Sequence, residues 1–476
     1  MSGATSHRGA LTLATYPVQR HHAATGPLQR PDPGVRIDGR NDLNRVETFA
    51  VKAILSAEAR RRPEKELNCE WGVSMTGTAQ VRGAWFGVRL LAVMALASGL
   101  TVATGAMDQP AGASTGSPVV FGDICSCTGA EASAIAPTSD VLLAWESWTN
   151  AHGGIAGHKV EVIIKDDALD PATSLADVQD LVAVNHIVGL LDNSDEDPAF
   201  AAYIEQQKVP VFGNTDTPTG QDNPDFYPPG TTNSNLVVAE AVALKRAHVK
   251  KLADLYCVED PVCASSVPPL EAELQKEGYG TEIVYKSGIA FAAPNYTGQC
   301  LAAKQAGATA VTVGDAAEIV TKVAMDCAQQ GYDPIELGVD GTVSSSWLPI
   351  PSMQGNIDVQ PDLPWFVHDA ATKEMFAALD KYAPSIPTSP DFGETSMTAW
   401  AGAEEALAAG NAGHLTSTPT AAEITNGLES FKGTTLGGLT PPLTFAKGKP
   451  HQIACFYEMG INDKKFVALN GGKYIC

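Results

Sequence analysis

Two largely apolar runs flank a helical pattern near residue 140 and predict one strand–helix–strand unit. Residues 119–124 form the first run and end at a small polar loop, and residues 160–164 form the second. Between them lie apolar side chains at helical spacing, which predict one buried helix face: Val141, Leu142, Ala144, Trp145 and Trp148. Gly153 and Gly154 end the helix, because glycine adopts the left-handed conformation at little cost. Such units build parallel sheets.

The same alternation of short buried runs and helical patterns continues along most of the chain. Strands are predicted at residues 187–191, 209–212, 251–257, 281–285, 310–313 and 335–339, with helices between them. A helix over 262–277 is expected to be interrupted by its prolines, and a strand–turn–strand is predicted from 443–445 and 453–459. The pattern predicts an α/β fold with two doubly wound parallel-sheet lobes.

Length and charge narrow the class of protein. The chain has 476 residues and a formal net charge of −22, and residues 107–476 carry 46 acidic and 19 basic side chains. This excess of negative charge argues against nucleic acid or an anionic membrane as a partner. About 370 residues exceed what one hydrophobic core usually supports, so two lobes are expected.

The N-terminal part of the sequence differs from the rest. Residues 1–74 show no sustained periodicity and are rich in arginine, which indicates an unstructured or mis-assigned extension. Residues 75–106 have the pattern of an export signal, in which two arginines precede an apolar run and small residues follow. Residues 107–117 are typical of a flexible linker. The protein is therefore expected in the periplasm or at the exterior of the cell envelope.

Eight of the nine cysteines follow residue 107, and an even number in an exported chain indicates disulfides. Proximity in the predicted topology suggests three pairings: Cys257–Cys263, Cys300–Cys327 and Cys455–Cys476. Cys125 and Cys127 are too close in sequence for a comfortable bridge. No CxxC motif has a second pair or histidines at finger spacing, so neither a metal nor a cofactor is expected.

Motifs for catalysis are missing from the sequence. There is no nucleophile elbow, no HExxH and no GxxxxGK[ST] phosphate loop, so the chain is not expected to be an enzyme. Acidic clusters at residues 166–167 and 192–197 are interpreted as solvated loop charge. His152 and His158 fall in predicted turns and are interpreted as surface groups.

Residues 150–171 carry the most specific pattern in the chain. The segment reads NAHGGIAGHKVEV and continues to Asp166-Asp167 and Asp170-Pro171. It resembles the opening of type I periplasmic binding proteins, the solute receptors of ABC importers for branched-chain amino acids and related molecules. Weaker similarity extends over about residues 117–470. Since Asp166-Asp167 matches a family position, the resemblance implies a mainly structural role there.

The resemblance also implies an architecture and a partner. The two lobes would be joined by three hinge crossovers, with residues 118–230 plus 362–432 in the first lobe and 231–361 plus 433–476 in the second. A small-molecule solute would bind in the cleft between the lobes and close it. The protein would be a monomer that docks on an ABC transporter permease.

Polar residues follow the predicted strands, and ligands of open parallel sheets bind at such strand ends. The residues expected to bind the solute are Ser126, Thr128, Asn193, Ser194, Thr215, Asp216, Thr217 and Asp340. The resemblance implies that Ser194 and Thr217 hold a carboxylate of the solute and that Asp340 holds its ammonium group. The family's covering tyrosine is not in place, because Ala316-Ala317 stand there; Tyr256 or Trp347 would have to compensate. The identity of the solute stays open.

The sequence thus favours an extracytoplasmic receptor of an ABC importer that captures an amino acid or a related small polar compound. A ligand sensor of the same fold, coupled to a signalling partner, is the alternative. A hydrolytic enzyme is favoured less, since no nucleophile–base pair can be placed.

Overall fold

The computed structural model describes residues 116–476 except 130–131, 214–216, 218, 260, 277 and 339–342. The extension at 1–74, the export signal at 75–106 and nearly all of the linker lie outside the described residues. No helix in the described part is long and apolar enough to cross a membrane.

The first sheet has five parallel strands in the order β2-β1-β3-β4-β5. Its strands are β1 (Val119–Cys125), β2 (Val160–Asp166), β3 (Gly189–Asn193), β4 (Val211–Gly213) and β5 (Phe226–Tyr227). All the carboxyl ends therefore lie along one edge, the edge at which polar loops were predicted.

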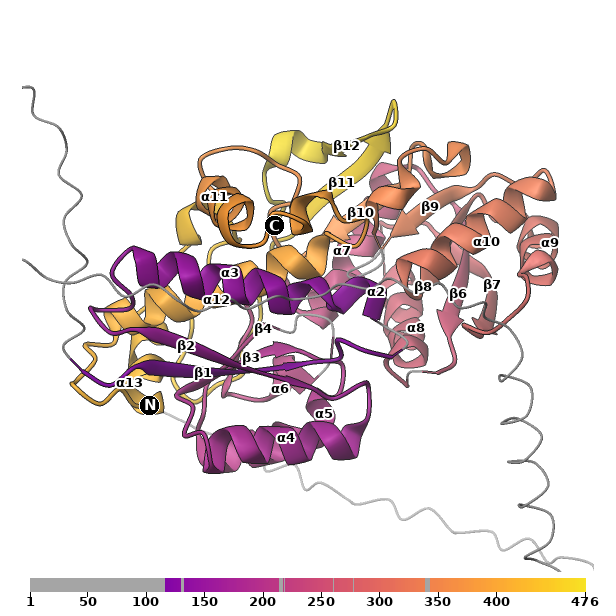
Figure 1. Ribbon diagram of the computed structural model, residues 1–476. Coiled ribbons are helices and arrows are strands. Elements are labelled where there is room, and N and C mark those ends of the chain that lie inside the picture. The colour runs from indigo at the N-terminus through magenta and orange to yellow at the C-terminus, as the bar shows by residue number, and fades with distance from the viewer. Residues whose placement is uncertain are drawn as a thin grey trace, which may run out of the picture. The chain divides into compact units, whose positions relative to one another are not determined.

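Helices cover both faces of the first sheet (Figure 1). On one face lie α3 (Pro137–Ala151), α12 (Glu394–Ala412) and α13 (Ala421–Leu428), with α11 (Lys373–Tyr382) packed on α3; on the other lie α4 (Pro171–Ala183) and α5 (Asp197–Gln207). The predicted face of α3 is confirmed, because Val141, Leu142 and Trp145 are fully buried. The helices α11, α12 and α13 come from residues 373–428, so the chain returns to the first sheet late in the sequence.

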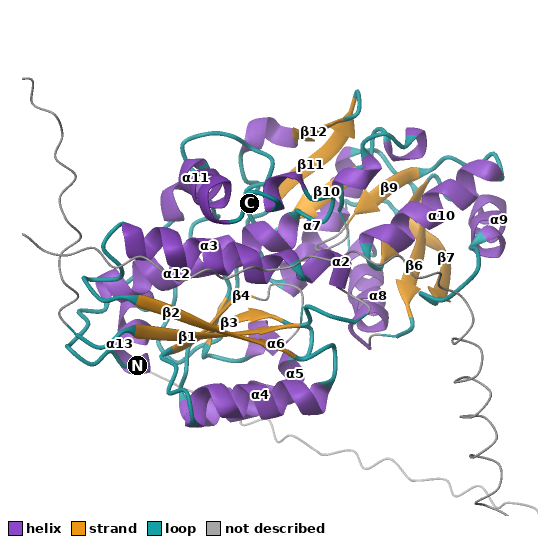
Figure 2. Cartoon of the chain, viewed as in Figure 1, coloured by secondary structure: helices purple, strands orange, loops and turns teal. Residues whose placement is uncertain are grey.

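The second sheet has seven strands in the order β12-β11-β10-β9-β8-β6-β7. They are β6 (Lys251–Cys257), β7 (Glu282–Ile289), β8 (Ala310–Gly314), β9 (Ile335–Gly338), β10 (Ile357–Gln360), β11 (Tyr457–Asn462) and β12 (Lys465–Ala468). Strands β6 to β10 pair in parallel, while β11 and β12 add an antiparallel edge. The helices α7 (Asn233–Arg246) and α8 (Pro261–Leu274) cover one face, and α9 (Thr297–Ala306) and α10 (Ala317–Gln329) cover the other (Figure 2).

The predicted α/β fold with two parallel-dominated sheets is confirmed. Three segments carry the chain between the sheets, and they meet at Thr231. Its hydroxyl donates to the carbonyl of Cys455 at 2.6 Å and its N–H to the carbonyl of Pro361 at 3.3 Å, while Thr232 donates to Ile453. The three crossovers are thus hydrogen-bonded to one another.

Three local predictions were wrong. The C-terminal hairpin is formed by β11 and β12, whereas residues 443–445 make only one bridge, between Leu443 and Thr434. The strand β10 was missed because prolines surround it and it has only four residues, too few for their alternation of apolar and polar side chains to stand out. The helix α8 runs without a break through Pro268 and Pro269, whose rings are exposed, where they displace no packed neighbour.

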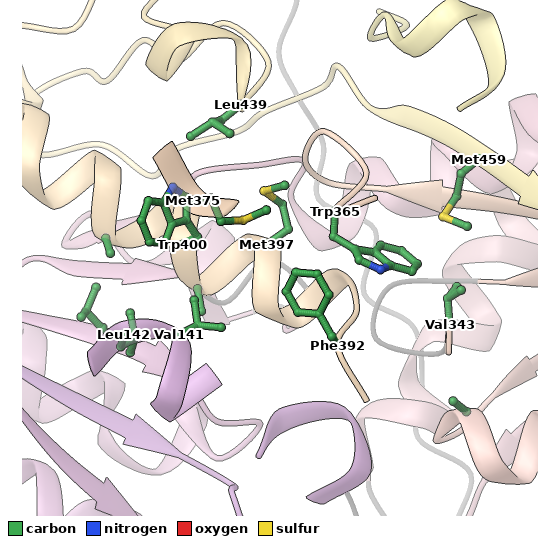
Figure 3. Packing of buried hydrophobic residues seen from close by; sticks show 14 of the residues in the cluster. Val141, Leu142, Val343, Trp365, Met375, Phe392, Met397, Trp400, Leu439 and Met459 are labelled. Carbon is green, nitrogen blue, oxygen red and sulfur yellow. The ribbon is translucent and has the colours of Figure 1, made fainter. Parts of the chain in front are cut away.

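The buried hydrophobic residues of the described part form three clusters, and the largest contains residues that cover both sheets, aromatic and sulfur-containing side chains among them. Figure 3 shows Met375, Met397 and Trp400 in this largest cluster, together with Trp365 and Phe392. Each is at most 5% exposed. Because α12 supplies Met397 and Trp400, its tight burial fixes the position of its first turn, which matters for the site below.

Four disulfides are present in the described part of the chain: Cys125–Cys127, Cys257–Cys263, Cys300–Cys327 and Cys455–Cys476. The last three are the expected pairings. The prediction against a Cys125–Cys127 bridge was wrong, because the chain turns as β1 ends. The turn brings the two Cα atoms to 5.1 Å, within the range that a disulfide spans.

Candidate functional site

The buried carboxylate of Asp167 joins the carboxyl ends of three neighbouring strands of the first sheet, β2, β1 and β3. Ser126 donates its hydroxyl to Oδ1 at 2.8 Å, and Ser194 donates its hydroxyl to Oδ2 at 2.5 Å. The N–H of Leu169 also donates to Oδ1, at 2.9 Å. Ser126 follows β1, Asp167 follows β2 and Ser194 follows β3, so the sheet register itself brings them together.

Two further pairs of the same kind lie beside this group. Thr217 donates its hydroxyl to Asp197 at the start of α5, and Asn193 donates its amide to Asp123 Oδ1 at 2.8 Å. Burial raises the pKa of Asp123 to about 7; the Asn193 hydrogen bond lowers it and the charge of Asp167 raises it further. A carboxyl group with this pKa exchanges its proton near neutral pH.

The interpretation of residues 166–167 and 192–197 as solvated loop charge holds for Asp166, which is exposed, but was wrong for Asp167, Asp192 and Asp197. Asp167 and Asp197 are 0% exposed and Asp192 is 2% exposed, because the strand ends are covered by the loops that follow them. His158 is also buried, with Nδ1 at 2.8 Å from the carbonyl oxygen of Ser117. His152 is exposed and stacks on Trp148, as a surface group does.

The structure brings together only part of the predicted site. Ser126, Asn193, Ser194 and Thr217 lie at neighbouring strand ends, and the side chain of each donates to an aspartate carboxylate of the protein. Thr128 is exposed and donates its N–H to Asp166 at 3.1 Å. The other three predicted residues lie outside the described part: Thr215, Asp216 and Asp340.

A cavity of about 180 Å³ lies where elements of both sheets meet. Its wall is formed by α2 (Ala132–Ile135), the first turns of α10 and α12, and the segments at residues 343–346 and 390–393. The helices α10 and α12 both contact α2, and they belong to the coverings of the second and first sheet, respectively. A small solute held here would therefore contact both halves of the fold.

The wall of the cavity is well supported from behind. Trp347 is fully buried and donates its indole N–H to the carbonyl of Ala317 at 3.1 Å, so it cannot cover a ligand as the sequence suggested. Gln360 donates to Glu394 at 2.9 Å, which ties the start of α12 to β10. Thr395 donates to the carbonyl of Ala134, which fixes α2 against α12.

Sequence reasoning missed the residues of this cavity. The missed polar groups are Ser133, Glu318, Ser344, Ser346, Asp391, Glu394 and Thr395. The available signal was weak: Glu318 and Glu394 sit in the first turns of helices, where acids commonly serve only to complement the helix dipole. Within the described ranges, no group of three or more metal-ligating side chains could hold a metal ion.

The family is decided by a match over most of the chain. A model of the family described as "Periplasmic binding protein" matches residues 118–465. The chain belongs to the periplasmic binding protein family. Proteins of this family are extracytoplasmic solute-binding receptors and not enzymes. Among curated proteins, no sequence matches this periplasmic binding protein.

Solved structures show the same fold as this periplasmic binding protein. A branched chain amino acid ABC transporter from Thermus thermophilus with bound valine has a TM-score of 0.66 at 16% identity, over 74% of this chain and 95% of that chain. A fatty acid ABC transporter substrate-binding protein from Thermomonospora curvata has a TM-score of 0.62 at 18% identity, over 74% and 91%. A branched-chain amino acid transporter substrate binding protein from Streptococcus pneumoniae, in complex with isoleucine, has a TM-score of 0.60 at 16% identity, over 74% and 98%.

Proposed function

We propose that this periplasmic binding protein captures a small solute in the cavity between its two sheets and delivers it to an ABC importer. The observation that carries the proposal is the cavity itself, because α2 and α12 supply one side of its wall and α10 supplies the other. A solute that touches both halves stabilises the closed arrangement of the two, which is how hinged receptors report that they are loaded.

The crossovers support the same proposal. Thr231 links all three connecting segments through hydrogen bonds, so the two halves move about one region. The expected lobes, 118–230 plus 362–432 and 231–361 plus 433–476, contain the first and second sheet, respectively. We propose that the protein acts as an exported monomer, without nucleic acid, on a permease that recognises the closed form.

A thermal-shift screen tests whether the protein binds a solute at all. The melting temperature of residues 107–476 is measured in the presence of amino acids, amides, aromatic acids and sugars. Amines and fatty acids are tested in a separate series. A solute that binds only the folded state raises the melting temperature, by an amount that grows with its concentration. No shift with any class would contradict the receptor function.

Filling the cavity should weaken solute binding. Ala134 lines the cavity from α2 and is half-buried, so Ala134→Phe places a ring in the space that a solute needs. Solute affinity should fall by about fivefold or more, since displacing a packed ring costs at least about 1 kcal/mol. The measurement is calorimetric titration with whichever solute the screen identifies.

Ala136→Phe is the matched control for this variant. Ala136 is exposed, lies two residues further along and does not line the cavity. Its affinity should equal that of the wild type. Equal affinity in both variants would place the solute elsewhere on the protein.

A further inference from the structure

The polar groups of the cavity wall are mostly hydrogen-bond acceptors. Three of them are carboxylates, from Glu318, Asp391 and Glu394, and the described residues of the wall include no lysine, arginine or histidine. Glu318 and Asp391 are exposed at the mouth of the cavity, while Glu394 is 2% exposed. A solute that carries its own donors would match this wall.

The hydroxyl groups of the wall add further acceptors. A hydroxyl has a single proton, and once it is donated, only the oxygen lone pairs remain for a ligand. Ser344 donates to the carbonyl of Pro390 at 2.8 Å, and Thr395 donates to the carbonyl of Ala134. Two hydroxyls of the wall can still donate: that of Ser133, which has no hydrogen-bond partner within the described residues, and that of Ser346, which is exposed.

The hydroxyl groups at the strand ends also donate their protons to other groups of the protein. Ser126 and Ser194 donate to the two oxygens of Asp167, and Thr217 donates to Asp197. All three hydroxyl side chains belong to residues at most 2% exposed. The groups that the resemblance assigned to a solute carboxylate therefore already donate to carboxylates of the protein.

Two helix starts point at the cavity and favour negative charge, so their strength must be compared with that of the acids. Neither α10 nor α12 has a side-chain cap, and each start carries about half a positive charge. Their sum is about +1, against a formal −3 from the wall. If the buried Glu394 is counted as neutral, the negative charge of the other two acids still exceeds the positive charge of the two helix starts. Asp391 also lies outside the first turn of both helices.

We propose that the solute is a small organic amine, cationic at neutral pH and without a carboxylate. The inference rests on the proposed receptor function and adds the chemical class of the ligand. An ammonium group supplies three donors to Glu318, Asp391 and the Ser344 oxygen, and it neutralises the excess negative charge. The apolar part of the wall, from Ala134, Val343 and Pro390, suits a short hydrocarbon body, and about 180 Å³ limits its size.

A set of matched solutes tests the charge requirement directly. The affinity of the protein is measured by calorimetric titration for three series of compounds, and each series has one hydrocarbon skeleton carried as an amine, an amino acid or an acid. The first series is isopentylamine, leucine and 4-methylpentanoate, and the second is butylamine, norvaline and pentanoate. The third is phenethylamine, phenylalanine and 3-phenylpropanoate. We expect at least one amine to bind about tenfold or more tightly than its amino acid, because the added carboxylate meets the excess negative charge of the wall. The corresponding acid should not bind measurably.

Substitutions of the two exposed acids locate the amine. Asp391→Asn and Glu318→Gln should each weaken amine binding by about threefold, as expected for partly solvated ion pairs, and should reduce its salt dependence. Glu205→Gln is the control, because Glu205 is exposed on α5 and does not line the cavity. Unchanged amine affinity in both acid variants would overturn the assignment.

The remaining outcomes separate this inference from the receptor function. An amino acid or acid that binds as tightly as its amine overturns the amine proposal and leaves the receptor function intact. Binding of a neutral sugar or amide, without binding of any amine, would likewise overturn the amine proposal and leave the receptor function intact. If no solute of any class binds, the receptor function fails, and the amine proposal fails with it.

Discussion

The protein should lose stability as the pH rises from about 5 to 8. Burial raises the pKa values of several carboxyl groups, to about 7 for Asp123, Asp254 and Glu404 and to about 8 for Glu240, although the charge of Lys286 lowers the pKa of Asp254 in part. Secondary causes differ: the charge of Asp254 raises the value of Glu240, whereas a hydrogen bond from Trp145 lowers that of Glu404.

The direction follows from proton uptake. Between the unfolded pKa near 4 and the folded pKa near 7, the folded protein binds more protons than the unfolded chain, so the free energy of unfolding falls as the pH rises. Moving one buried carboxyl from 3.8 to about 7 corresponds to about 4 kcal/mol. Summed over the four groups and moderated by relaxation, we expect a loss on the order of 5 kcal/mol.

His451 acts in the opposite direction and limits the effect at low pH. It is buried between Tyr227 and Phe445, and burial lowers its pKa to about 4. This histidine contributes stability above pH 6.5 that is lost as the pH falls toward 4. One histidine opposes four carboxyls, so the net change from pH 5 to pH 8 remains a loss.

Urea unfolding at pH 5.5 and pH 8 measures the effect. Asp123→Asn should flatten the dependence by the share of one carboxyl, because the amide oxygen can still accept from Asn193. Glu205→Gln, on the exposed surface of α5, should leave the dependence unchanged. A free energy of unfolding that is constant or larger at pH 8 would contradict the prediction.

Asp167→Ala should destabilise the fold by about 3 kcal/mol. The substitution leaves the hydroxyls of Ser126 and Ser194 and the N–H of Leu169 buried without their acceptor. Each orphaned donor costs about 1–3 kcal/mol, part of which is offset because a buried charge is removed. Asp167→Asn keeps one acceptor oxygen, so it should cost about half as much.

The neighbouring aspartate supplies the control. Asp166 accepts from the N–H groups of Thr128 and Ala168, but both bonds are exposed to water. Asp166→Ala should therefore cost less than about 1 kcal/mol. Urea unfolding at one pH compares the three variants, and equal losses for Asp166→Ala and Asp167→Ala would refute the role given to the buried carboxylate.

The sequence pattern predicts the elements that bury one face. It does not predict an element whose conformation depends on pairing with a neighbouring strand. Val141 and Trp145 recur at helical spacing, and that period alone identifies the core face of α3. The strand β10 has four residues in a proline-rich segment, and only its pairing with β9 and β11 makes it a strand. Local pattern carries no information on such pairing.

The site shows the same division more sharply. That Ser126, Ser194 and Thr217 end strands can be read from the sequence. The sequence does not show that their hydroxyl protons point at Asp167 and Asp197. This direction depends on the parallel register of strands that lie up to some 70 residues apart in the chain. The direction of a hydroxyl proton decides whether a site attracts a carboxylate or an amine, so the ligand class could not be predicted before the fold.

The late return of the chain to the first sheet sets the order in which the two halves can fold during synthesis. Trp145 in α3 is hydrogen-bonded to Glu404 in α12, 259 residues later, so the first core cannot close until most of the chain has been made. Strands β6 to β9 and helices α7 to α10 span only residues 233–338, whereas β10, β11 and β12 complete the same sheet from residues 357–468. The parallel strands β6 to β9 can therefore pair before α12 and α13, which cover the first sheet, have been made.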